Sequence, residues 1–337
     1  MSLLPPSPVA LVDVEILGRK AWRSSNLTPA DWTVELTQAA IAELTTATRR
    51  IDLHNDSVEA LRPESFELRA CYEVMAQVRE RLVNGCGLAV VNRVPVERFT
   101  VEQNRAIGWL LACALGQVVD QKWTGTRIYD VKDSGQKLEY GVRRSVTNLG
   151  QPFHTDGGWL YKTPAFVGLF CLESAPNGGM SRFTSLVTAH NEMRRQHRDL
   201  LARLYGPFAW DRQAEHAPDD SRFAWRPLFE NSGGVLAARY YDDYVVNGYR
   251  LADEAMDAIG RDAIAALAEI VNRPDHWVEF RVESGQFQYI NNRQFAHCRT
   301  AFEDASDGSQ LRHMLRIWNR DDGSVDLESR AQSEAAH

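Results

Sequence analysis

Apolar residues in the first third of the chain recur at the spacing of an amphipathic helix. Thr28 and Pro29 are typical of a helix start, because a capping residue precedes a proline at the first helical position. The apolar positions that continue this helix are Leu36, Ala40, Ile41 and Leu44. A second helix is predicted from about 63 to 83, with Gly85 placed to end it.

A capping box marks the start of a third helix. Thr100 and Gln103 stand three positions apart before an apolar run, and that helix is expected to end near Gly116. Two further helical stretches are predicted, an insertion at 188–206 and a helix at about 252–271.

Short runs rich in β-branched and aromatic residues lie between and after these helices. The clearest is CGLAVVNRV at 86–94, which predicts a buried strand. The other strand candidates are 117–123, 126–132, 165–173, 180–187, 234–241, 276–283, 286–291 and 311–319. Many short strands around a few helices favour a mainly β fold, a double-sheet jelly roll with a double-stranded β-helix core and flanking helices.

This pattern divides the chain into three parts. Residues 1–84 are predicted to form an N-terminal helical region that packs on the core. Residues 85–320 are predicted to form the jelly-roll domain with its helical insertions, and residues 321–337 a polar tail.

Composition narrows the functional classes. The chain has 337 residues, a formal net charge of −7 and no basic cluster, which argues against binding nucleic acid or an anionic membrane surface. No apolar run reaches the roughly 18 to 20 residues of a membrane span, and the N-terminus lacks the cationic start of a signal peptide. The five cysteines contain no C-x-x-C pair, so reduced thiols and a cytoplasmic protein are expected. Self-association into a homo-oligomer is left open.

Three residues have the chemistry of a metal site. His154 and Asp156 are two positions apart, so they share a face of an extended segment, and His297 is a remote third candidate. Two histidines and one carboxylate leave adjacent coordination positions open, which suits non-heme Fe(II). Taken alone, the His-x-Asp pattern is also compatible with buried structural histidines and with Asp156 forming a turn before two glycines.

The ordered motifs around these residues resemble the TauD/TfdA-like, or clavaminate-synthase-like, branch of Fe(II)/2-oxoglutarate-dependent dioxygenases. FHTDGGW at 153–159 matches the proximal ligand motif, and AFVGLFCLESAPNGGMSRFTS at 165–185 matches the strand and turn that follow it. An Asn-Asn-Arg turn at 291–293 leads to His297, and Arg312-His313-Met314-Leu315-Arg316 follows 15 positions later (312 − 297). The resemblance covers about residues 85–320.

The resemblance implies the cofactors and their ligands. It implies that His154, Asp156 and His297 bind Fe(II), that 2-oxoglutarate and O₂ are cosubstrates, and that succinate and CO₂ are released. It further implies that Arg312 holds the distal carboxylate of 2-oxoglutarate through its guanidinium fork. Ser181 occupies the place of a second donor to that carboxylate, with Thr184 and Ser185 as substitutes.

The resemblance leaves the reaction outcome and the role of Arg316 open. Related halogenases have Gly or Ala in place of Asp156, so this chain is expected to hydroxylate, desaturate or cyclise a small organic substrate, with hydroxylation foremost. Arg316 shares a strand face with Arg312, and three roles remain for it: contact with an anionic substrate, support of the cosubstrate, or structural pairing. Candidates to line the substrate pocket are Trp123, Tyr129, Tyr140, Trp159 and Tyr161.

Two other classes use part of this pattern. A zinc hydrolase takes the same three ligands with a water, but has no use for Arg312 and Ser181. A non-catalytic jelly-roll protein that binds a small molecule is the other alternative.

Overall fold

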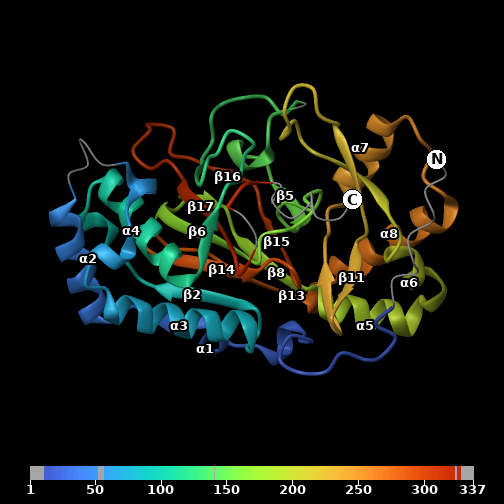
Figure 1. Ribbon diagram of the computed structural model, residues 1–337, viewed down its shortest axis with the longest axis horizontal. Coiled ribbons are helices and arrows are strands. Elements are labelled where there is room, and N and C mark those ends of the chain that lie inside the picture. Colours follow the sequence, from blue (N-terminus) through green and yellow to red (C-terminus); the bar gives the residue numbers. More distant parts are fainter. Residues whose placement is uncertain (1–10, 52–56, 140, 323–324, 328–337) are drawn as a thin grey trace.

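Two β-sheets form the centre of the molecule (Figure 1). The computed structural model describes residues 11–51, 57–139, 141–322 and 325–327. The larger sheet has the strand order β1-β2-β14-β6-β17-β3, with β4 also paired to β17. Its strands are β1 (Thr33–Glu35), β2 (Leu88–Asn92), β3 (Gln117–Val119), β4 (Ile128–Val131), β6 (Phe166–Glu173), β14 (Phe287–Asn291) and β17 (His313–Arg320).

The smaller sheet carries both histidines of the predicted metal site. Its order is β13-β8-β15-β5, with β5 (Gln151–His154), β8 (Ser181–Ser185), β13 (Trp277–Phe280) and β15 (Phe295–Arg299). Side chains of the two sheets meet in one apolar core, to which the larger sheet contributes Val167 and Ile290 and the smaller sheet Phe183 and Phe295. The remaining strands form two-stranded pairs: β7 (Asn177–Gly178) with β16 (Phe302–Glu303), β9 (Phe208–Asp211) with β10 (Phe223–Arg226), and β11 (Phe229–Ser232) with β12 (Val235–Ala238).

Helices cover the sheets in two groups. One group packs on the outer face of the larger sheet and shares a core with Phe170 and Phe287: α2 (Gln38–Arg50), α3 (Arg69–Val83) and α4 (Val101–Leu115). The other group lies at the opposite end of the molecule (Figure 1): α5 (Leu186–Gln196), α6 (Arg198–Leu204), α7 (Asp242–Ala252) and α8 (Ala258–Val271). Short 3-10 turns occupy Ser24–Asn26, Val58–Ala60, Pro63–Ser65, Val96–Arg98, Arg144–Val146 and Pro274–His276.

The predicted helix that begins at Pro29 is wrong in its extent. It ends after one turn as α1 (Pro29–Trp32), and β1 follows before Thr37 caps α2. The β-branched residues Thr33 and Val34 instead pair in parallel with Val90 and Val91 of β2, so the tertiary ladder overrides the helical start. The second helix also begins late, at Arg69, whereas the capping box of Thr100 and Gln103 is confirmed at the start of α4.

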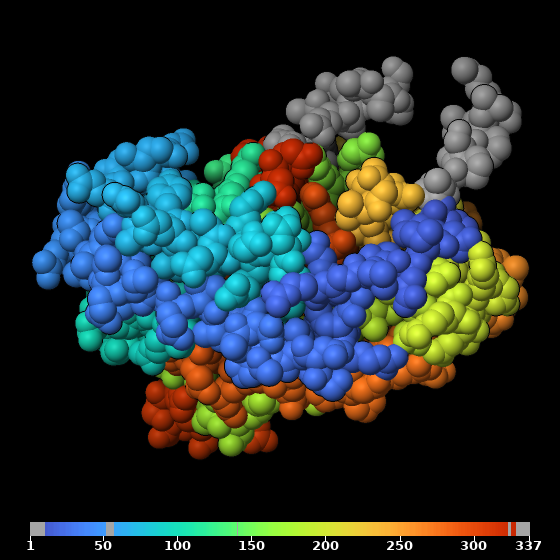
Figure 2. Space-filling model, turned by 90° about the horizontal axis from the view of Figure 1, so that it is seen from below, coloured from blue at the N-terminus to red at the C-terminus, as the bar shows by residue number. Residues whose placement is uncertain are grey.

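The N-terminal segment joins the two helical groups. In Figure 2 the blue chain crosses one face of the molecule from the first group to the yellow-green helices α5 and α6. Its far end is fixed by hydrogen bonds from Asn191 of α5, which donates to the Ile16 carbonyl and accepts from the Ile16 N–H. The predicted polar tail at 321–337 lies mostly outside the described residues.

None of the helices within the described ranges has the length and apolar character that crossing a membrane requires. The five cysteines are all free, and four of them are buried. Burial raises the pKa of Cys171 and Cys298 to about 12, so these two thiols stay protonated near neutral pH.

Candidate metal centre and cosubstrate pocket

The sheet register places His154 and His297 side by side. His297 of β15 pairs directly with His154, the last residue of β5, and their ring centroids are 4.2 Å apart. Directly paired residues of antiparallel strands project from the same face, so both imidazoles enter the space between the sheets. Asp156 follows two residues after His154, and one ligand atom from each of the three residues lies within 4.8 Å of the others.

The burial and charge of these three side chains fit a metal ion. Each is less than 9% exposed. Burial, with His154 nearby, lowers the pKa of His297 to about 3, and its Nδ1 atom has no hydrogen-bond partner among the described residues. Burial alone would raise the pKa of Asp156, but Arg316 and the two imidazoles hold it well below its ordinary value. Neutral imidazoles and an ionised carboxylate are the forms that bind a divalent cation.

Four groups fix the position of Asp156. Asn292 in the turn after β14 accepts the Asp156 backbone N–H (2.7 Å) and donates to its carbonyl (2.9 Å). The indole of Trp318 donates to Oδ2 at 2.8 Å, and Arg316 Nη1 lies 3.1 Å from the same oxygen. The other oxygen, Oδ1, lies 3.3 Å from His154 Nε2. The carboxylate is therefore held through one oxygen, and the second is directed at the ligand cluster.

His154 is oriented by its own strand. Its Nδ1 atom lies 2.9 Å from the carbonyl oxygen of Pro152, which fixes the tautomer that leaves Nε2 as the metal-binding atom. Gln151 Nε2 lies 2.9 Å from that Nε2 atom.

Glycine is required directly after the ligand. Gly157 has φ = +65°, and a Cβ atom there would lie 2.7 Å from Leu160 Cδ1. The left-handed turn lets the chain reverse beside the cluster, so Asp156 both precedes a turn and faces the ligand site.

Arg312 is a buried cation without a carboxylate partner within the described part of the chain. It is 3% exposed, its Nη1 atom has no hydrogen-bond partner there, and Nη2 contacts only the sulfur of Met314 at 3.0 Å. Burial lowers its pKa to about 10, while Cys171 and Asp304 act in the opposite direction. Asp304 accepts the backbone N–H of Arg312 at 2.7 Å and does not pair with the guanidinium, so the guanidinium is available to a ligand.

The cavity that Arg312 faces is continuous with the metal site. Its lining includes His154, His297 and Ser181. Thr184 and Ser185, the substitutes for Ser181, are engaged elsewhere: Thr184 donates to the His276 carbonyl and Ser185 to that of Lys20. Of the three predicted hydroxyls, Ser181 is the one that lines this cavity; Ser145, which was not predicted, lines it too, and its buried Oγ has no partner among the described residues.

A third arginine in this cavity was not predicted. Arg299 is 8% exposed; its Nη2 donates to the Thr147 carbonyl at 2.9 Å, whereas Nε and Nη1 have no partner among the described residues. Burial and the neighbouring Arg312 lower its pKa to about 9. Its place two residues after His297 on one strand was the signal that could have found it, since i and i+2 share a face.

Arg316 lies in the same cavity but is already engaged. Its Nη1 binds Asp156 and its Nε donates to Gln121 Oε1 at 2.8 Å, while Nη2 has no partner within the described ranges. Of the predicted pocket aromatics, Tyr129 and Trp159 are buried, whereas Trp123 and Tyr161 are more than half exposed. Tyr140 lies outside the described residues.

Comparison with known proteins identifies the family. The model of the taurine catabolism dioxygenase TauD, TfdA family matches residues 29–318. The chain belongs to this family. FR-33289 synthase of Streptomyces rubellomurinus is 27% identical over 316 residues, covering 92% of this chain and 91% of that protein.

Solved structures agree with the fold of this dioxygenase. An asparagine oxygenase in complex with Fe(II), 2S,3S-3-hydroxyasparagine and succinate superposes with a TM-score of 0.65 at 17% identity, covering 90% of this chain and 96% of that one. The non-heme iron oxygenase OrfP with Fe, succinate and (3S)-hydroxy-L-Arg gives 0.64 at 16% identity, covering 88% and 95%. The predicted fold class, a double-stranded β-helix with flanking helices, is confirmed.

Membership of the family settles the class of enzyme. The protein is an oxidoreductase, an Fe(II)- and 2-oxoglutarate-dependent dioxygenase, and its His-Asp-His cluster fits the iron. A zinc hydrolase and a non-catalytic binding protein, the two alternatives, do not explain the family match or the buried Arg312, whose guanidinium has no carboxylate partner in the described part of the chain.

Proposed function

We propose that His154, Asp156 and His297 bind Fe(II), that Arg312 and Ser181 anchor 2-oxoglutarate, and that the enzyme hydroxylates a small organic substrate with release of succinate and CO₂. The observation that carries this proposal is the buried guanidinium of Arg312, which faces the metal ligands and has no carboxylate partner in the described structure. A buried cation without a counter-ion is costly, and the distal carboxylate of 2-oxoglutarate would offset that cost.

Each residue group has a separate task. When bound, iron and 2-oxoglutarate supply the oxidant for a C–H bond, and the protein supplies position and a site shielded from water. The two imidazoles and the Asp156 carboxylate hold one face of the metal. Arg312 fixes the far end of the cosubstrate, and this fixes the direction from which its keto acid end approaches the metal.

We also propose that Arg299, with Arg312, binds the distal carboxylate of 2-oxoglutarate. The guanidinium carbons of Arg299 and Arg312 lie 4.8 and 5.1 Å from the ring centroid of Phe302, so the aromatic ring keeps two like charges close together. A bound carboxylate beside both guanidinium groups would relieve the repulsion between them.

An anionic substrate is the finer proposal. The ring of Tyr129 has three cations about it: Lys122 Nζ at 4.9 Å, Arg316 at 5.0 Å and Arg143 at 5.6 Å. Two of these cations already have a carboxylate, Arg143 at 2.6 Å from Glu215 and Arg316 at 3.1 Å from Asp156. The groups that can still meet an anion are Arg316 Nη2, which has no partner in the described ranges, and Lys122. A carboxylate, sulfonate or phosphonate would suit them. A cytoplasmic location also stays a proposal, and self-association stays open.

An anaerobic titration tests the metal and cosubstrate sites. With Fe(II) and 2-oxoglutarate the wild type should give a weak visible charge-transfer band, and His297→Ala should give none. Arg312→Ala should weaken 2-oxoglutarate binding by about two to three and a half decades, the equivalent of about 3–5 kcal/mol for a broken buried pair, with little change in iron affinity. Arg182→Ala is the matched control, since this neighbour of Ser181 on β8 pairs with Glu279 near the surface. An unaltered dissociation constant for 2-oxoglutarate in Arg312→Ala would overturn the assignment.

Turnover identifies the substrate. Succinate release is measured over a panel of small metabolites with Fe(II), 2-oxoglutarate and ascorbate, with Zn²⁺ in place of Fe(II) as the control. Release that depends on both Fe(II) and one class of metabolite supports the proposal, and hydrolysis of a panel member with Zn²⁺ alone contradicts it.

A further inference from the structure

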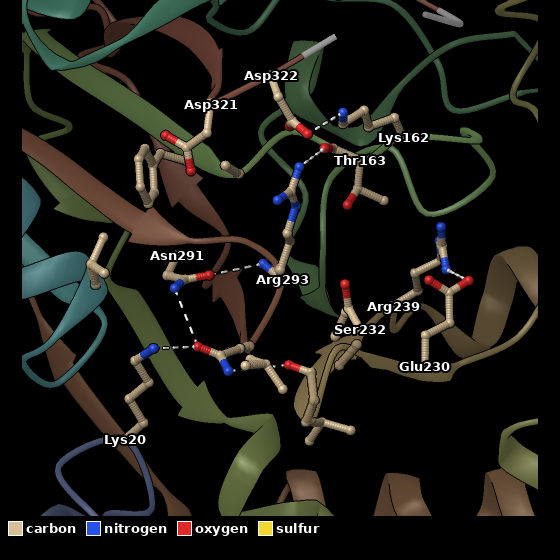
Figure 3. A pocket seen from close by; sticks show the side chains of 18 of the residues that line it. Lys20, Lys162, Thr163, Glu230, Ser232, Arg239, Asn291, Arg293, Asp321 and Asp322 are labelled. Carbon is tan, nitrogen blue, oxygen red and sulfur yellow. Dashed lines mark hydrogen bonds and ion pairs between the residues drawn. The ribbon is translucent and has the colours of Figure 1, made fainter. Parts of the chain in front are cut away.

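A second and larger cavity lies behind the turn that holds Asp156. It has a volume of about 560 Å³, which is within the range of small-molecule sites. The β11–β12 pair, the turn after β14, the loop that leads into β6 and residues 321–322 after β17 form its walls (Figure 3). None of the three metal ligands or the arginines of the cosubstrate pocket lines it.

Each acidic side chain in this wall already has a cationic partner. Lys162 lies 2.6 Å from Asp322, and Arg239 lies 2.5 Å from Glu230. Dashed lines mark both ion pairs in Figure 3. Asp321 pairs at 2.9 Å with Arg79, which stands outside the lining. Each acid therefore has a cation beside it. Lys20 and Arg293, the two other cations of the wall, form no ion pair with a carboxylate among the described residues.

Among the described residues, the side chains of Lys20 and Arg293 donate hydrogen bonds only to uncharged groups. Lys20 Nζ donates to Gln294 Oε1 at 2.7 Å, and Arg293 Nη2 donates to the Thr163 carbonyl at 3.2 Å. In Figure 3 the Arg293 side chain stands in the middle of the cavity. Both side chains are partly buried, and burial lowers the pKa of each. Asp322, Asp321 and Glu230 act on Arg293 in the opposite direction without forming an ion pair with it among the described residues.

We propose that this cavity binds a small oxyanion, a phosphate or carboxylate group of a metabolite, through Arg293 and Lys20. The planar guanidinium offers two parallel N–H groups to one oxyanion, and the ammonium adds a point charge. The lining has four cations and three acids, so a bound anion would balance its net charge of +1 and would replace water lost from Lys20 and Arg293. This site is separate from the iron site, so it does not depend on the function proposed above.

The site adjoins the iron centre through one turn. The side chain of Asn292 forms two hydrogen bonds with the backbone of Asp156. Its neighbours in the same turn, Asn291, Arg293 and Gln294, line the cavity. Arg293 also holds the carbonyl of Thr163 in the loop that begins at Asp156. A variant at Arg293 therefore needs a control for iron binding. Lys20, whose ammonium donates to Gln294, supplies an independent variant.

Calorimetric titration of the metal-free full chain tests the proposal, with inorganic phosphate and acetate as separate probes. We expect saturable binding of at least one probe, weakened at least tenfold in Arg293→Gln and in Lys20→Gln and retained in Arg293→Lys. The titrations are repeated in Arg312→Ala, which removes the carboxylate site of the cosubstrate pocket and should retain the binding that depends on Arg293 and Lys20. Lys132→Gln, an exposed lysine, is the charge-matched control.

The outcomes separate the sources of the anion. Binding of phosphate alone assigns a phosphorylated ligand, and binding of acetate assigns a carboxylate. Equal affinity in wild type, Arg293→Gln and Lys20→Gln, or loss only in Arg312→Ala, overturns the proposal. Circular dichroism shows whether each variant is folded. If Arg293→Gln is not folded, the probe affinity of Lys20→Gln tests the proposal, and an affinity equal to that of the wild type overturns it.

Discussion

Arg316 directly contacts Asp156, the carboxylate of the proposed iron site. Its guanidinium is fixed at two points, by Asp156 at Nη1 and by Gln121 at Nε, and only Nη2 is left to face the cavity. Structural pairing was one of the three roles that the sequence left open, and these contacts support it without removing the other two. A single arginine can hold the ligand and offer one remaining N–H pair to an anion.

Arg316→Leu separates these roles. If Nη2 binds an anionic group of the substrate, 2-oxoglutarate affinity should stay within a few-fold of wild type. Substrate-dependent succinate formation should then collapse, while slow decarboxylation without substrate survives. The measurements are 2-oxoglutarate binding and succinate formation with and without substrate. A parallel fall in both would place Arg316 with the cosubstrate instead.

Trp318 should tune the metal affinity through one hydrogen bond. Trp318→Phe removes the indole N–H that donates to Asp156 Oδ2 and keeps most of the buried ring. Partners of metal ligands typically contribute 10- to 100-fold to affinity, so a loss of that order in Fe(II) affinity is expected. Trp109→Phe is the control, because its indole donates to the distant Leu61 carbonyl. Equal Fe(II) affinity in both variants would contradict this role.

Sequence alone predicted most of the residues whose chemistry is local and missed a contact that depends on register. His154 and Asp156 stand two positions apart, although β5 ends at His154 and Asp156 lies in the turn that follows, and Arg312 follows from the resemblance to the family. Arg299 was missed although its spacing from His297 on one strand is a local signal. The hydrogen bond from Trp318 to Asp156 depends on which strands of two facing sheets oppose one another, and no local pattern reports that arrangement.

At the scale of elements, capping chemistry was more reliable than apolar spacing. The reciprocal bonds between Thr100 and Gln103 start α4 where the sequence placed it. The helical spacing of apolar residues after Pro29 predicted one helix where the structure has separate elements. Leu36 precedes α2, whereas Ala40 and Leu44 lie within it. The intervening Thr33–Glu35 strand depends on its pairing with β2, more than 50 residues later in the chain.

The α4 cap should contribute measurably to stability. Thr100→Ala leaves the Gln103 N–H without its side-chain acceptor, so the free energy of unfolding should fall by about 1 kcal/mol. Thr46→Ala is the control: Thr46 is exposed in the middle of α2, and alanine has the higher helix propensity there. Urea unfolding of both variants measures the difference. A Thr100→Ala variant as stable as Thr46→Ala would show that the cap contributes nothing.

At the scale of the whole molecule, buried histidines make the stability depend on pH. His190 on α5 is fully buried, with Nε2 2.8 Å from the Tyr205 hydroxyl and Nδ1 without a partner among the described residues. Burial, with Arg194 nearby, lowers its pKa to about 4. The unfolded chain takes up this proton near pH 6.5 and the folded chain only near pH 4, so stability falls as the pH falls through that window.

His190→Gln should flatten this dependence. The full shift corresponds to about 3 kcal/mol, which the wild type should lose between pH 6.5 and 4 and the variant should not lose at this position. His197→Gln, at a partly exposed position just after α5, is the control and should follow the wild type. Denaturant unfolding at pH 7 and pH 4.5 gives the comparison. Parallel pH profiles of wild type and His190→Gln would contradict the assignment.

The N-terminal segment that crosses the molecule has a consequence for synthesis on the ribosome. Ile16 is bonded to Asn191, 175 positions later, and Val12 to Tyr205, 193 positions later. Synthesis adds about 5–20 residues per second, so Asn191 and Tyr205 are made roughly 10–40 s after the N-terminal segment that they bind. Contacts between residues so far apart in sequence also form slowly during folding. The N-terminal segment should therefore be among the last parts of the chain to reach its native position. Until then the surface that it covers is exposed to the chaperones and proteases of the cell.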